Sequence, residues 1–256
     1  MADGLQSLAD ALGVKPGEVV AFIGAGGKTT AIYCVAADLA ARGLQVIVTT
    51  TTKIFPPDRP EIALVLEEAG WGTLAARAAA AFGRAKVVAV ASKRLADGKL
   101  EGIRADTIGA LRGIRGVGAV LVEADGAARK PFKAPAGHEP VIPPATTLLV
   151  VVVGAGALGQ PLSAEVAHRP ELVAQQAGLR MGDPLTPEAV ARVLLGRENL
   201  RGRPPGARLA ALITKAIAPP ARSGAERLAR LLKGGGASPV ILAELAADPP
   251  VIAVSV

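Results

Sequence analysis

The chain has 256 residues, of which 50% are hydrophobic and only 2% aromatic, and its formal net charge is +7. This length can bury one sizeable core. With so few aromatic residues the core must be built from Ala, Val, Leu and Ile, which suits parallel strands alternating with Ala-rich helices. Because the basic residues are scattered and lack aromatic neighbours that could stack on bases, the composition argues against a nucleic-acid-binding groove.

Cysteine content and hydropathy exclude further classes. The single cysteine, Cys34, rules out an intramolecular disulfide, and we expect it in the core. No Cys/His cluster has zinc spacing, and no apolar run reaches membrane-spanning length. The N-terminal "MADGLQSLADALGV" lacks the features of a signal peptide. We therefore expect a cytoplasmic protein with neither a membrane nor a nucleic acid as partner.

Apolar runs rich in β-branched residues alternate along the chain with Ala/Leu-rich stretches of helical period. Strands are predicted at 18–23, 45–50, 86–91, 117–123, 146–153, 208–214, 239–243 and 251–255. Helices are predicted near 4–13, 28–42, 72–83, 105–113, 163–178, 187–195 and 221–233. The alternation predicts a three-layer α/β fold, a mostly parallel sheet with helices on both faces. We expect one domain over residues 1–256, with 160–256 as a possible smaller C-terminal subregion.

The first predicted strand leads through "GAGGKTT" into a helix, the order that a phosphate-binding loop requires. Glycines let backbone N–H groups converge on an anion, and Lys28 adds a mobile cation beside the helix N-terminus. The Thr29 hydroxyl falls where Mg²⁺ bound to the phosphates would lie. The common form G-x-x-x-x-G-K-[ST] would need glycine at Phe22, so the loop instead resembles the short loop of Mur-ligase-type ATP-binding domains. We expect phosphate contacts from Gly24, Ala25, Gly26, Gly27, Lys28, Thr29 and Thr30.

The second strand ends in "TTTTK", at the edge where open α/β sheets bind ligands. Threonine favours strands, which is one explanation of the run. The alternative is a shell of hydroxyls and one amine around Mg²⁺ and phosphate, in which Thr51, Thr52 and Lys53 take part. The Pro- and Gly-rich stretches 53–61 and 126–145 follow strand ends and are long enough to be functional loops.

"VEADGAARKPFKAP" is an apolar strand that ends in two carboxylates, the Walker B arrangement. Magnesium prefers oxygen ligands, so Glu123 is expected to hold it together with Thr29. Asp125, on the same side of an extended chain, would orient a water or an acceptor. Lys130 and Lys133 would stabilise developing charge on the phosphate, unless they are simply solvated.

Two later motifs have open roles. Gly154, Gly156 and Gly159 form a G-x-G-x-x-G pattern, but neither the early helix nor the acidic residue of a dinucleotide-binding site follows it. "LITKA" lies where many P-loop proteins carry N-K-x-D, with Thr214 in place of Asn and Ile217 in place of Asp. Guanine specificity is therefore not expected, although Lys215 could pack over a base.

His138 and Glu139 could form an acid–base pair.

Several motifs run in the same order over nearly the whole chain as in the YqeC family, which the chain therefore resembles. They are "GAGGKTT", "VTTTTKIF", "VEADGAARKPFKAPAGHEPVIP", "GAGALGQPL", "HRPE" and "LITKA". That family is described as selenium-dependent hydroxylase accessory proteins encoded near molybdenum hydroxylases. The resemblance implies a P-loop NTPase-like nucleotide-binding protein that helps to mature a molybdenum hydroxylase or its cofactor.

Three functions remain open from the sequence. The first is a Mg²⁺-dependent nucleoside triphosphatase or phosphotransferase that uses ATP, with GTP or another triphosphate as alternatives, and an unknown small-molecule or cofactor substrate. The second is a nucleotide-gated chaperone that turns over little and binds an apo-hydroxylase or carries a pterin-type cofactor. The third is a Rossmann-type dinucleotide binder that uses the 154–159 glycines.

Overall fold

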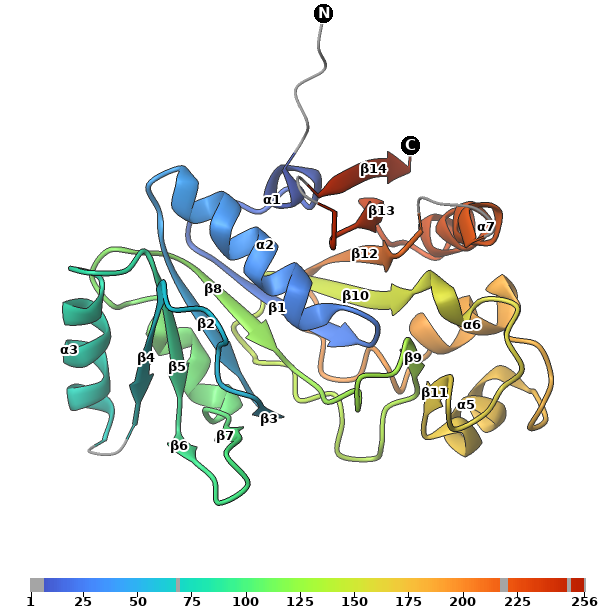
Figure 1. Cartoon of the computed structure of the whole chain (residues 1–256), viewed down its shortest axis with the longest axis horizontal. Coiled ribbons are helices and arrows are strands. Elements are labelled where there is room, and N and C mark those ends of the chain that lie inside the picture. Colours follow the sequence, from blue (N-terminus) through green and yellow to red (C-terminus); the bar gives the residue numbers. More distant parts are fainter. Residues whose placement is uncertain (1–6, 68–69, 217–220, 248–249, 256) are drawn as a thin grey trace, which may run out of the picture.

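The computed structural model describes residues 7–67, 70–216, 221–247 and 250–255. Its main feature is a nine-stranded sheet that runs across the whole molecule (Figure 1). The strands are β1 (Glu18–Gly24), β2 (Gln45–Thr50), β4 (Ile62–Leu66), β5 (Val87–Ala91), β8 (Val117–Glu123), β10 (Leu148–Gly154), β12 (Arg208–Thr214), β13 (Val240–Glu244) and β14 (Val251–Ser255). Their spatial order is β14-β13-β12-β10-β1-β8-β2-β5-β4, and only the β13–β14 pair is antiparallel. The predicted mostly parallel sheet is confirmed.

Helices cover both faces of this sheet. They are α1 (Leu8–Ala11), α2 (Lys28–Ala41), α3 (Trp71–Ala81), α4 (Ile108–Leu111), α5 (Pro170–Ala177), α6 (Pro187–Leu194) and α7 (Ala221–Gly234). Alternate side chains of β1 enter two separate hydrophobic cores. Val20 and Phe22 belong to the core that contains residues of α1 and α2. Val19, Ala21 and Ile23 belong to the core that contains residues of α3, α4, α6 and α7. The three-layer α/β fold predicted from the sequence is therefore confirmed.

Short strands fix the loops at one edge of the sheet. Strands β3 (Lys53–Ile54), β6 (Lys93–Arg94) and β7 (Leu100–Glu101) form a small antiparallel sheet, and β9 (Phe132–Lys133) pairs with β11 (Ala167–His168). Two 3₁₀ turns lie at Ala105–Thr107 and Ala155–Ala157. These elements tie the two long Pro- and Gly-rich loops to the rest of the fold, although none of them has the length or the pattern of a predictable strand.

Two predicted helices differ from the structure, and one strand was not predicted. The helix expected at 163–178 begins only at Pro170, because Arg169 has a left-handed backbone (φ 61°) and residues 167–168 are taken up by β11. The helix expected at 105–113 is a 3₁₀ turn followed by α4. Strand β4 was not predicted. The first part of the helix expected at 4–13 lies outside the described residues.

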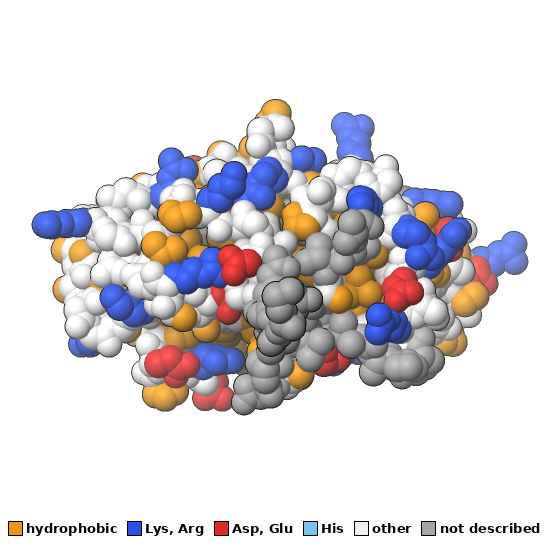
Figure 2. Space-filling view, turned by 90° about the horizontal axis from the view of Figure 1, so that it is seen from above, with side chains coloured by type: hydrophobic (Ala, Val, Ile, Leu, Met, Phe, Trp, Pro, Cys, Tyr) orange, Lys and Arg blue, Asp and Glu red, His pale blue; other side chains and the backbone are white. Residues whose placement is uncertain are grey.

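Three expectations drawn from the composition concern the basic residues, the cysteine and the helix lengths. On the face that Figure 2 shows, Lys and Arg side chains are scattered among uncharged ones. Cys34 is partly buried against the α1–α2 core. Within the part of the chain that the structure describes, none of the helices combines the length and the apolar character needed to cross a membrane.

Candidate functional site

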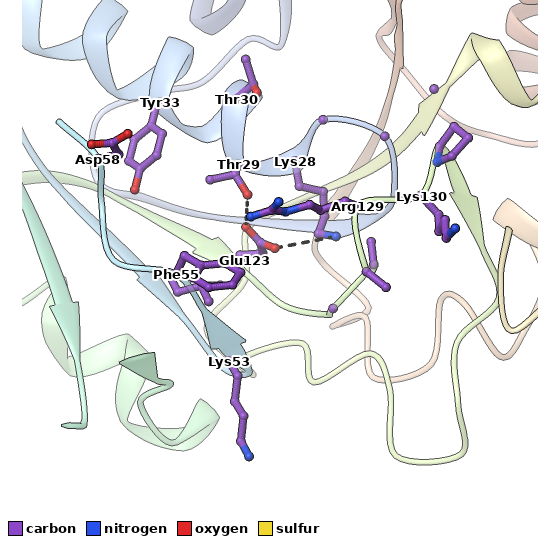
Figure 3. Close-up of a pocket in the computed structure, with 18 of the residues that line it drawn as sticks. Lys28, Thr29, Thr30, Tyr33, Lys53, Phe55, Asp58, Glu123, Arg129 and Lys130 are labelled. Carbon is purple, nitrogen blue, oxygen red and sulfur yellow. Dashed lines mark hydrogen bonds and ion pairs between the residues drawn. The ribbon is translucent and has the colours of Figure 1, made fainter. Parts of the chain in front are cut away.

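A cavity of about 860 Å³ opens where the central strands end. The turn after β1, the last residue of β8 and the end of β10 all contribute to its lining, as do the loops that follow β2 and β8. Figure 3 shows side chains from these segments converging on it. The carboxyl ends of neighbouring parallel strands are the usual ligand-binding edge of such a sheet.

The glycine-rich turn is shaped by backbone conformations that only glycine adopts easily. Gly24, Gly26 and Gly27 have φ angles of 95°, 82° and 134°. A side chain on Gly26 would overlap the backbone of Gly154, and one on Gly24 would overlap the carbonyl of Val152. The turn is therefore packed tightly against β10 and leads straight into α2.

The start of α2 presents unpaired amide groups to the cavity. Gly27 is the N-cap and provides no side-chain acceptor for the first turn. The amides of Lys28, Thr29 and Thr30 open the helix, so they have no acceptor within it. Lys28, Thr29 and Thr30 also line the cavity. This end of the helix carries partial positive charge and suits an anion.

Lys28 and the acidic strand end meet directly beneath the turn. The Lys28 amine donates to the Gly24 carbonyl at 2.7 Å and lies 3.1 Å from Asp125 Oδ1 and 3.8 Å from Glu123 Oε1. The Thr29 hydroxyl donates to Glu123 Oε2 at 2.8 Å (Figure 3). The predicted association of Lys28, Thr29 and Glu123 is thus present in the structure.

A row of buried charges continues from Asp125 away from the cavity. Asp125 Oδ2 accepts the Gly24 amide at 2.9 Å and lies 3.0 Å from the Lys133 amine. Lys133 also donates to Glu139 at 2.6 Å, and Glu139 pairs with Arg169 at 2.7 Å. Neither Asp125 nor Lys133 is among the cavity-lining residues. Their predicted direct action on the phosphate stays a prediction, because these contacts do not test it.

The surroundings shift the pKa values of two carboxyl groups in opposite directions. Burial raises the pKa of Glu123, and the nearby Lys28 amine opposes that rise. Burial would also raise the pKa of Glu139, but hydrogen bonds from Arg169 and Lys133 outweigh it and lower the pKa from 4.5 to about 2. Glu139 therefore stabilises the fold above pH 4.5, and that contribution is lost as the pH falls toward 2.

The threonine run is mostly structural. The hydroxyls of Thr49, Thr50 and Thr51 each donate to a backbone carbonyl of a neighbouring segment at 2.8 Å. Thr51 and Thr52 line a second, adjacent cavity of about 610 Å³ rather than the one at the glycine turn, whereas Lys53 lines both. The predicted phosphate contacts of Thr51 and Thr52 stay a prediction.

His138 and Glu139 are neighbours in sequence, but their side chains lie in different surroundings. Glu139 is buried and held by Lys133 and Arg169, whereas His138 is exposed and lines the second cavity. With a pKa of about 2, Glu139 is a poor proton acceptor at neutral pH. These surroundings do not favour an acid–base pair.

The charge of the main cavity suits a polyanion. Its basic lining residues are Lys28, Lys53, Lys99, Arg129, Lys130 and Lys215, and its acidic ones are Asp58 and Glu123. Arg129 and Lys215 have left-handed backbones, with φ angles of 60° and 55°. Such conformations cost about 1–3 kcal/mol in residues other than glycine and cluster at functional sites. Two of the cations are therefore held in the cavity wall by strained backbone.

The glycine pattern after β10 packs against the glycine-rich turn. Gly154 donates its amide to the Pro131 carbonyl at 2.9 Å and packs against Gly26. The Thr214 hydroxyl bonds the Gly26 carbonyl from the end of β12. After Gly154 the chain makes a 3₁₀ turn instead of the long helix of a dinucleotide-binding unit. Ile217, which stands where many P-loop proteins carry a guanine-reading aspartate, lies outside the described residues.

Several cavity residues were not predicted. They are Tyr33, Phe55, Asp58 and Lys99. Phe55 follows a strand end in "TTKIFPP", so its place in a Pro-rich loop was a usable signal. Lys99 enters through the hairpin of β6 and β7, which nothing in the sequence pairs with the glycine turn.

The residues present fit a magnesium-bound nucleotide. Among the described residues, no group of three His, Cys, Asp or Glu side chains could hold a metal alone. Magnesium commonly takes one or two protein oxygens and completes its shell with water and phosphate. Thr29 and Glu123 provide that number of oxygens at the foot of the glycine turn.

Comparison with known proteins shows the family to which the chain belongs. The family model described as YqeC protein matches residues 20–171. The sequence is also 32% identical over 180 residues to a protein of Escherichia coli (strain K12) named "Uncharacterized protein YqeC", covering 68% of this chain. The chain belongs to the YqeC family. The resemblance inferred from the motifs is confirmed, and the YqeC match contains every site residue discussed above up to Arg169. The aligned region spans 64% of the Escherichia coli relative.

Proposed function

We propose that this YqeC-family protein binds a magnesium nucleoside triphosphate in the cavity at the glycine turn, and hydrolyses it or transfers its terminal phosphoryl group. The observation that carries the proposal is the Thr29–Glu123 hydrogen bond of 2.8 Å beside the buried Lys28 amine. Lys28 and Thr29 begin α2, which follows β1, and Glu123 is the last residue of the adjacent strand β8. Together they match the chemical needs of a Mg-phosphate group.

Each residue of the turn has a distinct role in this proposal. The amides of Gly26 to Thr30 and the Lys28 amine would bind the phosphate oxygens. Thr29 and Glu123 would hold Mg²⁺, which when bound neutralises charge on those oxygens. Asp125 and Lys133 would position Lys28 and the Gly24 amide, because their own contacts are with these groups and with Glu139.

The base and the biological setting belong to the same proposal. ATP is favoured over GTP because Thr214 binds the Gly26 carbonyl and the N-K-x-D pattern is absent. Lys215, which lines the cavity, would then face the base. From the motif resemblance we also propose an accessory role in maturing a molybdenum hydroxylase or its cofactor.

A second candidate function is a nucleotide-gated chaperone or carrier with little turnover. It is favoured because the two carboxylates nearest the glycine turn, Glu123 and Asp125, are already bound by neighbouring residues. Among the described lining residues only Asp58 and Glu123 are acidic, and Glu123 is engaged by Thr29. Asp125, the other acidic residue of the motif, is buried by the contacts of Gly24, Lys28 and Lys133. Neither carboxylate of the β8 strand end is therefore free to act as a general base beside the glycine turn, which suits slow hydrolysis.

The Lys28→Met variant tests nucleotide binding. Because it removes the amine that contacts the Gly24 carbonyl but keeps an apolar stem, we expect Mg-ATP affinity to fall about 100-fold, as for the loss of charged hydrogen bonds. Isothermal titration calorimetry measures the change. The exposed Lys233→Met serves as the matched control, and thermal denaturation of both variants verifies that they are folded.

Full Mg-ATP affinity in folded Lys28→Met would refute the proposed nucleotide site. Phosphate release then separates the two candidates. Steady turnover by the isolated protein supports the enzyme, whereas release that occurs only with a molybdenum hydroxylase present supports the gate.

A further inference from the structure

An exposed aromatic ring lies in the wall of the nucleotide cavity. The Phe55 side chain is 55% exposed. Among the described residues, Met181 is the other large hydrophobic residue that is exposed. Two cations lie over the Phe55 ring, the Lys99 amine at 5.4 Å and the Arg129 guanidinium at 5.2 Å from its centroid. Cation–π attraction holds the two cations at the ring, and the part of the ring that stays exposed offers a contact surface to an aromatic ligand.

The surrounding fold holds this group in place. Strand β3 pairs with β7 so that Ile54 faces Leu100, which brings the following Phe55 beside the preceding Lys99. Arg129 reaches the ring from the loop after β8, with the left-handed backbone already described. Figure 3 shows Tyr33, Phe55 and Asp58 at one end of the cavity and Lys130 at the other. The ring and its cations therefore come from separate elements that converge.

The sheet order indicates which part of a bound nucleotide this end would meet. Strands β8 and β2 lie on one side of β1, whereas β10 and β12 lie on the other. Thr29 and Glu123 mark the position of the terminal phosphates on the first side. Lys215, at the end of β12, lines the cavity on the second side, where the base would lie. Phe55 follows β2, so it lies beyond the terminal phosphate and away from the base.

We propose that Phe55, Lys99 and Arg129 form the subsite for a second ligand, a planar aromatic compound that carries negative charge. The ring would stack on Phe55 while its anionic group meets Lys99, Arg129 or Lys53. This assignment rests on the proposed function, because it uses the Mg-phosphate position to distinguish the two ends of the cavity. Base–aromatic stacking of this kind is insensitive to the exact ring.

The probe for this subsite is pterin-6-carboxylate, a fluorescent fused-ring anion, titrated into the protein saturated with Mg²⁺ and a non-hydrolysable ATP analogue. We expect Phe55→Leu to weaken the probe about tenfold, and Phe55→Trp to restore it to within about twofold, because only the aromatic variant stacks. Met181→Leu is the matched control on an exposed apolar side chain. Cyclohexanecarboxylate, an anion without a flat ring, is expected to bind at least about tenfold more weakly than the probe.

Calorimetry with the ATP analogue alone distinguishes this subsite from the nucleotide site. We expect Phe55→Leu to leave analogue affinity within about twofold of the unmodified protein. A parallel loss of analogue affinity would place the nucleobase on Phe55 and overturn the subsite. Failure of the unmodified protein to bind the probe below about 1 mM, or equal binding of cyclohexanecarboxylate, would also overturn it. Failure to bind the analogue at all, with the probe still bound, would refute the nucleotide site instead.

Discussion

Two lysines of the loop that follows β8 lie three residues apart in very different surroundings. Lys130 lines the cavity, whereas Lys133 is 1% exposed and lies between Asp125 and Glu139. A buried amine is tolerated only when carboxylates and carbonyls compensate for its lost hydration. Lys133 meets this requirement with two carboxylates and the Gly126 carbonyl at 2.6 Å.

The pair Lys133→Met and Lys130→Met tests this difference. Lys133→Met leaves two buried carboxylates short of a cation, so we expect the free energy of unfolding to fall by about 3 kcal/mol. Lys130→Met is expected to change it by no more than about 0.5 kcal/mol, because its amine lies at the cavity wall. Urea unfolding followed by circular dichroism measures both. Equal effects would show that the row of charges does not stabilise the loop.

At the scale of single residues the sequence predicted that Lys28, Thr29 and Glu123 lie together, but it did not predict the buried charges around them. Lys28, Thr29 and Glu123 could be identified because their motifs have a fixed order relative to strands and a helix. The burial of Asp125 and Lys133 could not, because "EADGAARKPFK" contains nothing to show which charges turn inward. That choice depends on Glu139 and Arg169, which approach from farther along the chain.

Among the elements, the contact between the glycine turn and the end of β10 is the tightest feature of the site. Gly26 has a φ of 82° and no room for a side chain beside Gly154, whereas a side chain on Gly156 would meet nothing within 4 Å. Position 26 therefore requires glycine, a side chain on Gly154 would come within 3.1 Å of the Pro131 Cβ, and Gly156 has room for a side chain.

Gly26→Ala and Gly156→Ala form a matched pair. We expect Gly26→Ala to lower the free energy of unfolding by about 2 kcal/mol and to weaken Mg-ATP binding, because both the left-handed backbone and the overlap with Gly154 oppose it. Gly156→Ala is expected to change stability by less than about 0.5 kcal/mol. Thermal shifts with Mg-ATP and with NADH complete the comparison. A shift by NADH that disappears in Gly156→Ala would support a dinucleotide site.

The larger elements were predictable because their hydrophobic period is long and regular. Strand β4 was missed because it follows a Pro-rich stretch and only Val65 among its five residues is fully buried. The start of α5 was misplaced because the helix-like composition of 163–169 is overridden by β11 and by the backbone of Arg169. The two-residue strands depend on contacts between distant segments, which local patterns do not contain.

In the molecule as a whole, one sheet joins the N-terminal and C-terminal parts. Strands β12, β13 and β14 extend it directly from β10. Helix α7 belongs to the same core as α3 at the other end. This continuity supports one domain over a separate subregion at 160–256.

Differential scanning calorimetry tests the domain organisation. We expect a single unfolding transition whose calorimetric and van't Hoff enthalpies agree to within about 10%, because no part of the sheet can leave without exposing the shared core. Two resolved transitions, or a stable fragment beginning near residue 160 after limited proteolysis, would indicate that the C-terminal part folds separately.

The alternating charges from Lys28 to Arg169 also connect two distant parts of the molecule. Lys28 is the member of this row that lines the cavity, and Arg169 is the N-cap of α5. A bound phosphate that draws the Lys28 amine toward itself would leave Asp125 to rely more on Lys133, and Glu139 more on Arg169. Four consecutive ion pairs link the amine beneath the glycine turn to the residue that caps α5, although these residues come from separate segments of the chain.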